Sequence, residues 1–140
     1  MFLNSNFGKS VDILQRAMDV SVLRRQVIAN NIANADTPHF KRSTVNFESS
    51  LKRALDAEKE KPALEAFEND PRDMSFFNPP RWQDVAPRRV LDYLSQSKSN
   101  GNNVDLEQEM MDAQQNQMQY TIMAQAVADE FNQINIVLRR

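Results

Sequence analysis

The sequence predicts a mainly α-helical protein, in which long amphipathic helices at the N- and C-termini form a helical hairpin or coiled-coil-like pair around an irregular middle. Apolar residues recur in alternating steps of three and four near both ends of the 140-residue chain, which is the spacing of a helix seam. All six prolines lie between these two ends. We therefore expect an N-terminal helix within residues 1–35, an irregular segment with short helices and loops in 36–103, and a C-terminal helix within 104–140.

The N-terminal helix is predicted from nine positions between Phe7 and Ala35, of which seven are apolar. A second apolar row beside this seam indicates that the helix contacts more than one partner. Ser10 or Asp12 is a suitable cap for its first turn. Pro38 disfavours helical backbone at the residue before it, so we expect the helix to end near Ala35.

The middle segment is not typical of a disordered linker, because it holds seven of the eleven aromatic residues. We expect an irregular structure that is locally helical around Phe47–Lys59 and that orders fully only against something else. Residues 95–103 are rich in serine and asparagine and predict a loop before the last helix.

The C-terminal helix has the more regular pattern, with nine of ten seam positions from Leu106 to Leu138 apolar. Asp105 with Gln108 fits an N-terminal capping pair. A continuous helix of about 33 residues is roughly 50 Å long at 1.5 Å per residue. A helix of this length buries its whole apolar stripe only against another long helix or against other subunits.

The charge distribution favours pairing of the two ends. Residues 1–35 carry a net charge of +2, residues 36–103 a net charge of zero and residues 104–140 a net charge of −4. The cationic side chains are scattered and form no basic stripe, so nucleic acid is a poor fit as a partner. No segment has the roughly 20 apolar residues that span a bilayer, and the N-terminus lacks the pattern of a cleaved signal peptide.

No chemistry of an enzyme is visible in the sequence. Two glycines and no cysteine leave little room for phosphate-binding loops, disulfides or thiolate sites. The single histidine, His39, follows a proline and fits a turn. The acidic cluster Asp105, Glu107, Glu109 and Asp112 fits a solvated helix start better than a cation site. We expect no catalytic residue, cofactor, metal ion or small-molecule substrate.

Two stretches of the chain carry distinctive motifs. Arg24–Arg42 reads R-R-Q-V-I-A-N-N-I-A-N-A-D-T-P-H-F-K-R, and Gly101–Met110 reads G-N-N-V-D-L-E-Q-E-M, followed by N-Q-M-Q-Y at Asn116–Tyr120. Both stretches resemble motifs of the flagellar basal-body rod proteins. The family usually has glycine and tyrosine after the T-P, where this chain has His39 and Phe40. The motif residues are Ala29, Asn30, Asn31, Ile32, Ala33, Asn34, Asp36, Thr37, Pro38, Gly101, Asn102, Val104 and Asp105.

The resemblance implies a structural role. The terminal helices of such subunits pack together as a rod core and stack with neighbouring subunits into a helical tube, the axial rod that crosses the periplasm. It implies a place at the base of the rod, near the membrane ring and the export apparatus, with other rod proteins and further copies as partners. The residues expected at the assembly interface are Leu14, Met18, Ile28, Ile32, Leu106, Met110, Tyr120, Val127, Phe131, Ile134 and Leu138.

The resemblance also implies export through the flagellar type III system without a cleaved signal peptide. Early substrates of that system carry a short F-x-x-x-apolar element, and Phe47 with Leu51 has this form. The same spacing also fits simple packing of a short helix.

Other functions stay open at this point. The apolar stripes also fit an ordinary intramolecular hairpin. A soluble helical adaptor or export chaperone of the flagellar system would bind a client helix and never polymerise. A hydrolase acting on cell-wall glycan would need a pair of well-placed carboxylates, and none is identifiable.

Overall fold

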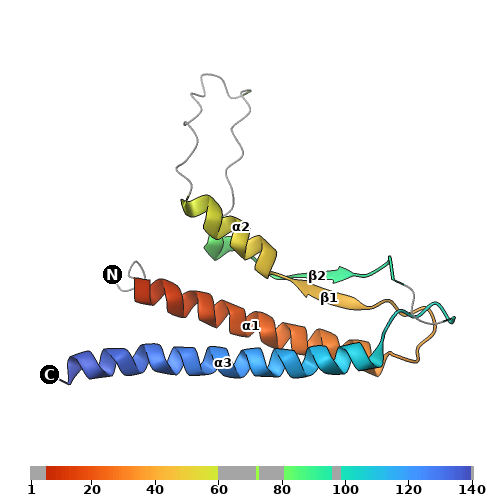
Figure 1. The fold of residues 1–140 in the computed structure, drawn as a ribbon. Helices are drawn as coiled ribbons and strands as arrows, with labels where there is room; N and C mark the ends of the chain where they lie inside the picture. Colours follow the sequence, from red (N-terminus) through yellow and green to blue (C-terminus); the bar gives the residue numbers. More distant parts are fainter. Residues whose placement is uncertain (1–5, 60–71, 73–80, 96–98, 140) are drawn as a thin grey trace. The chain divides into compact units, whose positions relative to one another are not determined.

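The computed structural model describes residues 6–59, 72, 81–95 and 99–139. The elements in chain order are α1 (Asn6–Ala33), β1 (Ser43–Asn46), α2 (Glu48–Lys59), the 3₁₀ turn η2 (Trp82–Asp84), β2 (Arg88–Leu91) and α3 (Leu106–Leu138). The predicted fold class is confirmed: the protein is mainly helical, its two long terminal helices pack against each other, and the sequence between them forms a small irregular middle (Figure 1). The parts of that middle in 60–71, 73–80 and 96–98 lie outside the described residues.

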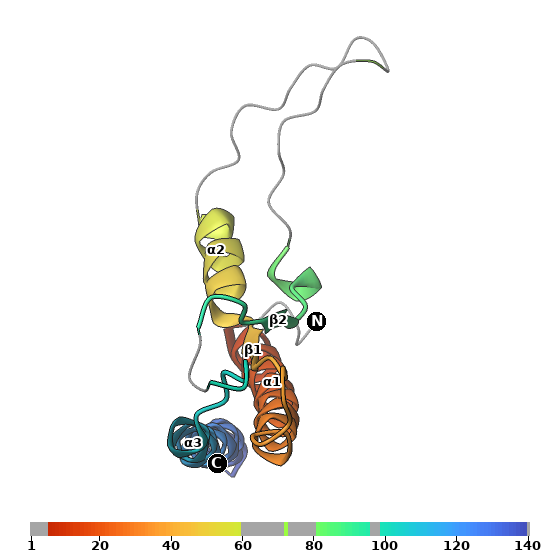
Figure 2. The ribbon, with the colours of Figure 1, turned by 90° about the vertical axis from the view of Figure 1, so that its right-hand side faces the viewer.

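Helices α1 and α3 lie side by side and run antiparallel (Figures 1 and 2). The rings of Phe7 and Phe131 meet edge to face with centroids 5.7 Å apart. Further along, the Ser21 hydroxyl donates to Oδ1 of Asn116 over 2.9 Å. The Asn116 Nδ2 donates in return to the Ser21 carbonyl, also over 2.9 Å. Residue numbers rise along α1 while those of their partners in α3 fall, from Phe7 with Phe131 to Ser21 with Asn116. The two helices therefore form an antiparallel hairpin.

The start of α1 differs from the prediction. Ser10 and Asp12 lie inside the helix, because α1 already includes Asn6 and Phe7. The expectation that one of them caps the first turn is therefore wrong. The contact between Phe7 and Phe131 gives the earlier turn an apolar partner, which stabilises helix before the predicted cap.

The end of α1 lies at Ala33, two residues before the predicted end at Ala35. The Asn34 amide donates to the Asn30 carbonyl over 3.2 Å, and the Ala35 amide donates to the Ile32 carbonyl over 3.1 Å. The helix therefore tightens into a turn just ahead of Pro38, as the steric effect of a proline requires.

The prediction for α3 is confirmed in its length of 33 residues and in its cap. A side-chain oxygen of Asp105 accepts hydrogen bonds from the amides of Glu107 and Gln108, at 3.0 and 3.4 Å. The Gln108 side chain does not reach back to close a capping box. Its Nε2 donates instead to Asp112 over 2.9 Å, one turn further along the helix.

A two-stranded sheet of β1 and β2 was not expected from the sequence. Each strand has only four residues, which is too short for an alternating pattern to be distinctive. In β1 the buried positions are Ser43 and Val45, so half of its buried side is a hydroxyl rather than an apolar group.

The chain divides into two compact units, one of residues 1–45 and 89–140 and the other of residues 46–88. In the second unit α2 packs near η2, with buried Phe47, Ala54, Trp82 and Val85. Helix α2 matches the helix predicted around Phe47–Lys59. The division into terminal segments 1–35 and 104–140 and a middle 36–103 stays a prediction. No helix in the described part of the chain is long and apolar enough to cross a lipid bilayer.

A matched pair of valine substitutions tests the hairpin core. Val20 is 3% exposed, whereas Val137 is 73% exposed. We expect Val20→Ala to lower the free energy of unfolding by about 2 kcal/mol, since two buried carbon groups and a cavity are involved. Val137→Ala should change it by less than about 0.5 kcal/mol. Urea unfolding of dilute protein measures both, and equal effects would contradict the packing of α1 on α3.

Candidate functional site

At the closed end of the hairpin, a buried asparagine joins α1 to β1 and to α3. Asn31 of α1 is fully buried. Its Oδ1 accepts from the Ser43 amide over 3.1 Å, and its Nδ2 donates to the Ser43 carbonyl over 2.8 Å. The side-chain amide thus pairs with β1 as a neighbouring strand would. The same Nδ2 lies 3.2 Å from both carboxylate oxygens of Glu109 in α3.

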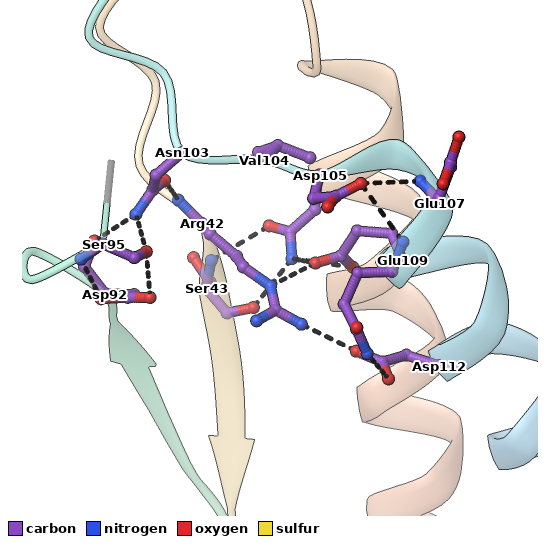
Figure 3. Close-up of polar contacts among 12 residues, drawn as sticks. Arg42, Ser43, Asp92, Ser95, Asn103, Val104, Asp105, Glu107, Glu109 and Asp112 are labelled. Carbon is purple, nitrogen blue, oxygen red and sulfur yellow. Dashed lines mark hydrogen bonds and ion pairs between the residues drawn. The ribbon is translucent and has the colours of Figure 1, made fainter. Parts of the chain in front are cut away.

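Glu109 is the buried charge of this cluster, with 0% of its surface exposed. Its carboxylate forms an ion pair with Nε of Arg42, while Nη2 of Arg42 lies 2.7 Å from Asp112 (Figure 3). The expectation that this acidic cluster is a solvated helix start is therefore wrong for Glu109. Its burial is compensated by Arg42 and Asn31, which supply the positive charge and the donor that a buried carboxylate needs.

The guanidinium of Arg42 responds to two opposing influences. Burial lowers the pKa of Arg42, but the hydrogen bond with Glu109 and the negative charges of Glu109 and Asp112 outweigh burial and raise that pKa above its ordinary value. The side chain is 23% exposed, so one part of it stays in contact with water. Arg42 is therefore a permanent cation that holds β1 to α3.

Asn102 satisfies the end of α1. Its Nδ2 lies 2.9 Å from the Asn34 carbonyl, 3.1 Å from the Ala35 carbonyl and 2.8 Å from the Thr37 carbonyl. All three residues follow α1, which ends at Ala33, so their carbonyls lie outside the hydrogen-bond ladder of the helix. The Oδ1 of Asn102 accepts from the Val104 amide over 2.7 Å, which directs the chain into α3. One side chain thus caps the end of α1 and orients the approach to α3.

Asn103 connects two further segments, the residue before β1 and the loop after β2. Its Oδ1 accepts from the Arg42 amide over 2.6 Å, and its Nδ2 donates to the Asp92 carbonyl over 2.7 Å and to the Ser95 hydroxyl over 3.1 Å (Figure 3). Asp92 in turn accepts from the Ser95 hydroxyl and from the amides of Ser95 and Leu94, and these hydrogen bonds lower the pKa of the Asp92 carboxyl. The loop after β2 is therefore fixed to β1 through Asn103.

The turn after Pro38 explains why the family usually has glycine where this chain has His39. His39 has φ 59°, in the left-handed region that glycine enters without steric cost. Its amide donates to the Asn100 carbonyl over 3.2 Å. Gly101 has φ 78°, and a Cβ there would lie 2.9 Å from Nδ1 of His39. The two sequence motifs therefore meet at close range, and the second requires glycine.

The structure brings the two halves of the motif together. Asn31, Asn102 and Val104 are fully buried, Asn34 and Thr37 supply carbonyls, and Asp105 caps α3. Ile32 is half-buried, as are Asn34 and Gly101. The exposed motif residues are Ala29, Asn30, Ala33, Asp36, Thr37, Pro38 and Asp105. The buried residues of the motif thus form the internal joint of the hairpin, and its other residues lie around this joint.

The residues predicted for the assembly interface are distributed differently. Ile28 is buried in the hairpin. The half-buried ones are Leu14, Met18, Ile32, Tyr120, Val127 and Ile134. The exposed ones are Leu106, Met110, Phe131 and Leu138. Four of the eleven, Met18, Tyr120, Val127 and Phe131, line a shared groove of about 360 Å³ between α1 and α3. Their role in assembly stays a prediction.

Leu106 and Met110 lie outside that groove because the first turns of α3 bury polar residues. The buried positions of α3 are Glu109 and Asn116. Apolar periodicity does not predict these buried polar positions of α3. It also does not predict the polar residues that complete the joint, which are Ser21, Arg42, Ser43 and Asn103. A polar residue at a seam position of an otherwise apolar helix is the available signal, and it points to Ser21 in α1 but not to its partner Asn116, which lies beside the seam of α3.

The predicted export element lies in the second unit. Phe47 is 2% exposed and Leu51 is half-buried. The Leu51 amide donates to the Phe47 carbonyl over 2.9 Å, so the two residues span the first turn of α2. Both the export role and the simple packing role remain compatible with this placement.

The described residues offer no place for metal chemistry. They contain no group of three or more histidine, cysteine, aspartate or glutamate side chains that could hold a metal ion. A second groove of about 250 Å³ lies beside the cluster, lined by both Arg42 and Glu109, whose charges already pair with each other.

A matched pair of glutamate substitutions tests the buried ion pair. Glu109→Gln should lower the free energy of unfolding by about 2 kcal/mol, because Arg42 loses its main anion. This value is below the usual cost of breaking a fully buried pair, since Arg42 is partly exposed. The control Glu107→Gln changes an exposed residue in the same helical turn and should cost under about 1 kcal/mol. Equal midpoints in urea would show that Glu109 and Arg42 are not coupled.

The chain was compared with known proteins. The family model described as flagella basal body rod protein matches residues 22–41, which include most of the first motif. The flagellar basal body rod protein FlgB of Borreliella burgdorferi is 44% identical over 135 residues, covering 96% of this chain and 99% of the relative. FlgB of Bacillus subtilis is 31% identical over 134 residues, with 96% of each chain covered. FlgB of Escherichia coli is 28% identical over 127 residues, with 89% of each chain covered.

These relatives match this chain over nearly its whole length, and the resemblance inferred from the two motifs is confirmed. The hairpin joint, the family model and the relatives all involve the segment that ends α1. The protein belongs to the FlgB family of flagellar basal body rod proteins and is a structural component of that kind.

Proposed function

We propose that this protein polymerises through its terminal helices into the proximal part of the axial rod, after export by the flagellar type III system. Its partners are further copies of itself and other rod proteins, at the base of the rod near the membrane ring and the export apparatus. The relatives are named as rod components and not as enzymes, and we propose no catalytic activity.

The observation that carries this proposal is the contrast between a fixed joint and an uncovered apolar surface. At the closed end, hydrogen bonds of Asn31, Asn102 and Asn116 fix α1 to α3 and to the loops between them. A subunit that must repeat its contacts many times needs such a rigid core. The side-chain amides of this joint find partners within the chain, whereas the buried hydroxyl of Ser43 has none among the described residues.

Along α3, in contrast, many large apolar side chains stay exposed. They are Leu106, Met110, Met111, Met118, Ile122, Phe131, Ile136, Val137 and Leu138, each between 41% and 74% exposed. Exposed apolar patches mark interaction sites on soluble proteins, and these side chains supply exposed apolar surface along α3. Methionines also adapt to contacts that differ between neighbours, as positions in a tube next to several proteins require.

A helical adaptor or export chaperone of the flagellar system is the alternative. It predicts a stable monomer or dimer that stays in the cytosol. The exposure of apolar residues along the whole length of α3, rather than in one client-sized cleft, favours assembly with several neighbours.

Incorporation into basal bodies tests the proposal. The tagged chain is expressed with an intact flagellar export system, and purified basal bodies are assayed for it. We expect Met110→Asp to lower incorporation at least about tenfold, because burying an unpaired charge costs several kcal/mol and 1.4 kcal/mol corresponds to a factor of ten. Met110 is 58% exposed, so the monomer should fold as before.

The control is Gln114→Asp, which adds the same charge at an exposed polar position one turn along α3. It should assemble normally. Equal incorporation of both variants would place Met110 outside the contact, and retention of the unmodified chain in the cytosol would refute the rod proposal.

The export element is tested by secretion. We expect Phe47→Ala to lower the secreted fraction several-fold if Phe47 is read by the export apparatus. The matched control is Trp82→Ala, which removes another buried aromatic side chain from the same unit. Both should destabilise that unit by about 3–5 kcal/mol. If both variants are secreted at the same reduced level, loss of folding explains the effect of Phe47→Ala. If neither is reduced, Phe47 has no role in export.

A further inference from the structure

Helix α3 extends beyond the described part of α1 at the open end of the hairpin (Figure 1). Phe131 faces Phe7, and the described part of α1 begins one residue earlier, at Asn6. Ile136, Val137 and Leu138 follow Phe131 by five to seven residues, or about 8–10 Å at 1.5 Å per residue. They are 71%, 73% and 74% exposed. We call Ile136–Arg139 the C-terminal overhang.

The second feature is the groove between α1 and α3, which we call the hairpin groove. Its apolar lining is Val11, Met18, Val22, Tyr120, Val127 and Phe131, and its polar lining is Gln15 and Asp19. Its volume of about 360 Å³ is near the lower end of the range of about 300–1,000 Å³ for pockets that bury a ligand. It therefore suits a few aliphatic side chains rather than a large molecule.

The charges of the two features are complementary. Asp19 lies in the hairpin groove and Arg139 ends the overhang, and neither has an ion-pair partner among the residues that the structure describes. The last carbonyls of α3 also lack partners within the helix, and Gln15 carries an amide that can donate to them. The overhang thus combines apolar side chains with the cation of Arg139, and the hairpin groove combines an apolar lining with the anion of Asp19.

The overhang of one molecule cannot enter its own groove. Val127 and Leu138 lie on one continuous helix, eleven residues apart, so they are separated by roughly 16 Å along a rigid rod. An overhang that enters the groove therefore belongs to a different molecule.

We propose that the hairpin groove of one copy binds the C-terminal overhang of a second copy. This inference rests on the proposed function and specifies the contact. The two surfaces differ, so in a head-to-tail contact each bound copy still presents an empty groove or a free overhang. Such contacts continue from copy to copy, either into a closed ring or into an open helical array.

The absence of cysteine from the chain allows a direct test. Val22→Cys and Leu138→Cys variants of the full chain are mixed at high concentration and oxidised, and covalent dimers are quantified and mapped. Val22 is 46% exposed and Leu138 is 74% exposed, so both variants should keep the helicity of the parent. A disulfide forms only where the two Cα atoms come within about 7 Å.

The matched control replaces Val22→Cys by Met118→Cys, which is 61% exposed and does not line the hairpin groove. We expect the mixture with Val22→Cys to give about ten times more mixed dimer, since docked thiols react at a high effective concentration. Equal yields in the two mixtures would overturn the inference. So would a predominance of Val22–Val22 dimers, because that product indicates an isologous contact.

The orientation is tested by charge reversal. Asp19→Arg in the Val22→Cys chain should lower the yield of mixed dimer several-fold. Arg139→Asp in the Leu138→Cys partner should restore it, and a failure of restoration would contradict the proposed pairing of Asp19 with Arg139.

The same two cysteine variants, expressed together in flagellated cells, separate this inference from the proposed function. Incorporation into basal bodies without the mixed dimer would mean that a rod subunit uses another surface, and would overturn only the groove contact. A disulfide from Val22→Cys solely to a different protein would also overturn the second copy as occupant. Absence of both variants from basal bodies would overturn the proposed function itself.

Discussion

The rest of the structure depends on the buried carboxylate of Glu109. A charge with no exposed surface is tolerated only if other groups replace the water that it has lost. Here the replacements come from two different places in the chain, Asn31 in α1 and Arg42 just before β1. Each of these partners is useful only when the other two are in position. One electrostatic requirement therefore fixes the register of the long helices and the path of the chain that leaves α1.

Asparagine carries out most of the remaining connections, because its side-chain amide has both a donor and an acceptor. Asn31 pairs with Ser43 as a strand would, Asn102 closes the end of α1, and Asn103 fixes the loop after β2. The buried residues of the family motif therefore form an internal joint. The surfaces that meet other molecules are expected elsewhere, on the side chains that this joint leaves uncovered.

Prediction from sequence succeeded where one local rule was decisive. Pro38 located the end of α1 to within two residues, Asp105 identified the start of α3, and apolar spacing predicted both long helices. It failed where distant groups decide the outcome. A glutamate near a helix start is ordinarily exposed to solvent. Glu109 is buried because Arg42, which is distant in sequence, pairs with it. The strand at Ser43 is set by the side chain of Asn31, which no propensity of four residues can reveal.

The joint has a consequence for the order of folding. Its bonds connect positions far apart in the chain: Asn31 with Glu109 spans 78 residues, Asn102 with Asn34 spans 68, and Asn116 with Ser21 spans 95. Contacts of such high sequence separation form only after a large loss of chain entropy. If only the first half of the chain is free to fold, Asn31 and Ser21 lack their partners Glu109 and Asn116 in α3. The tertiary structure of the joint therefore forms only when the last helix, Leu106–Leu138, is free to fold as well.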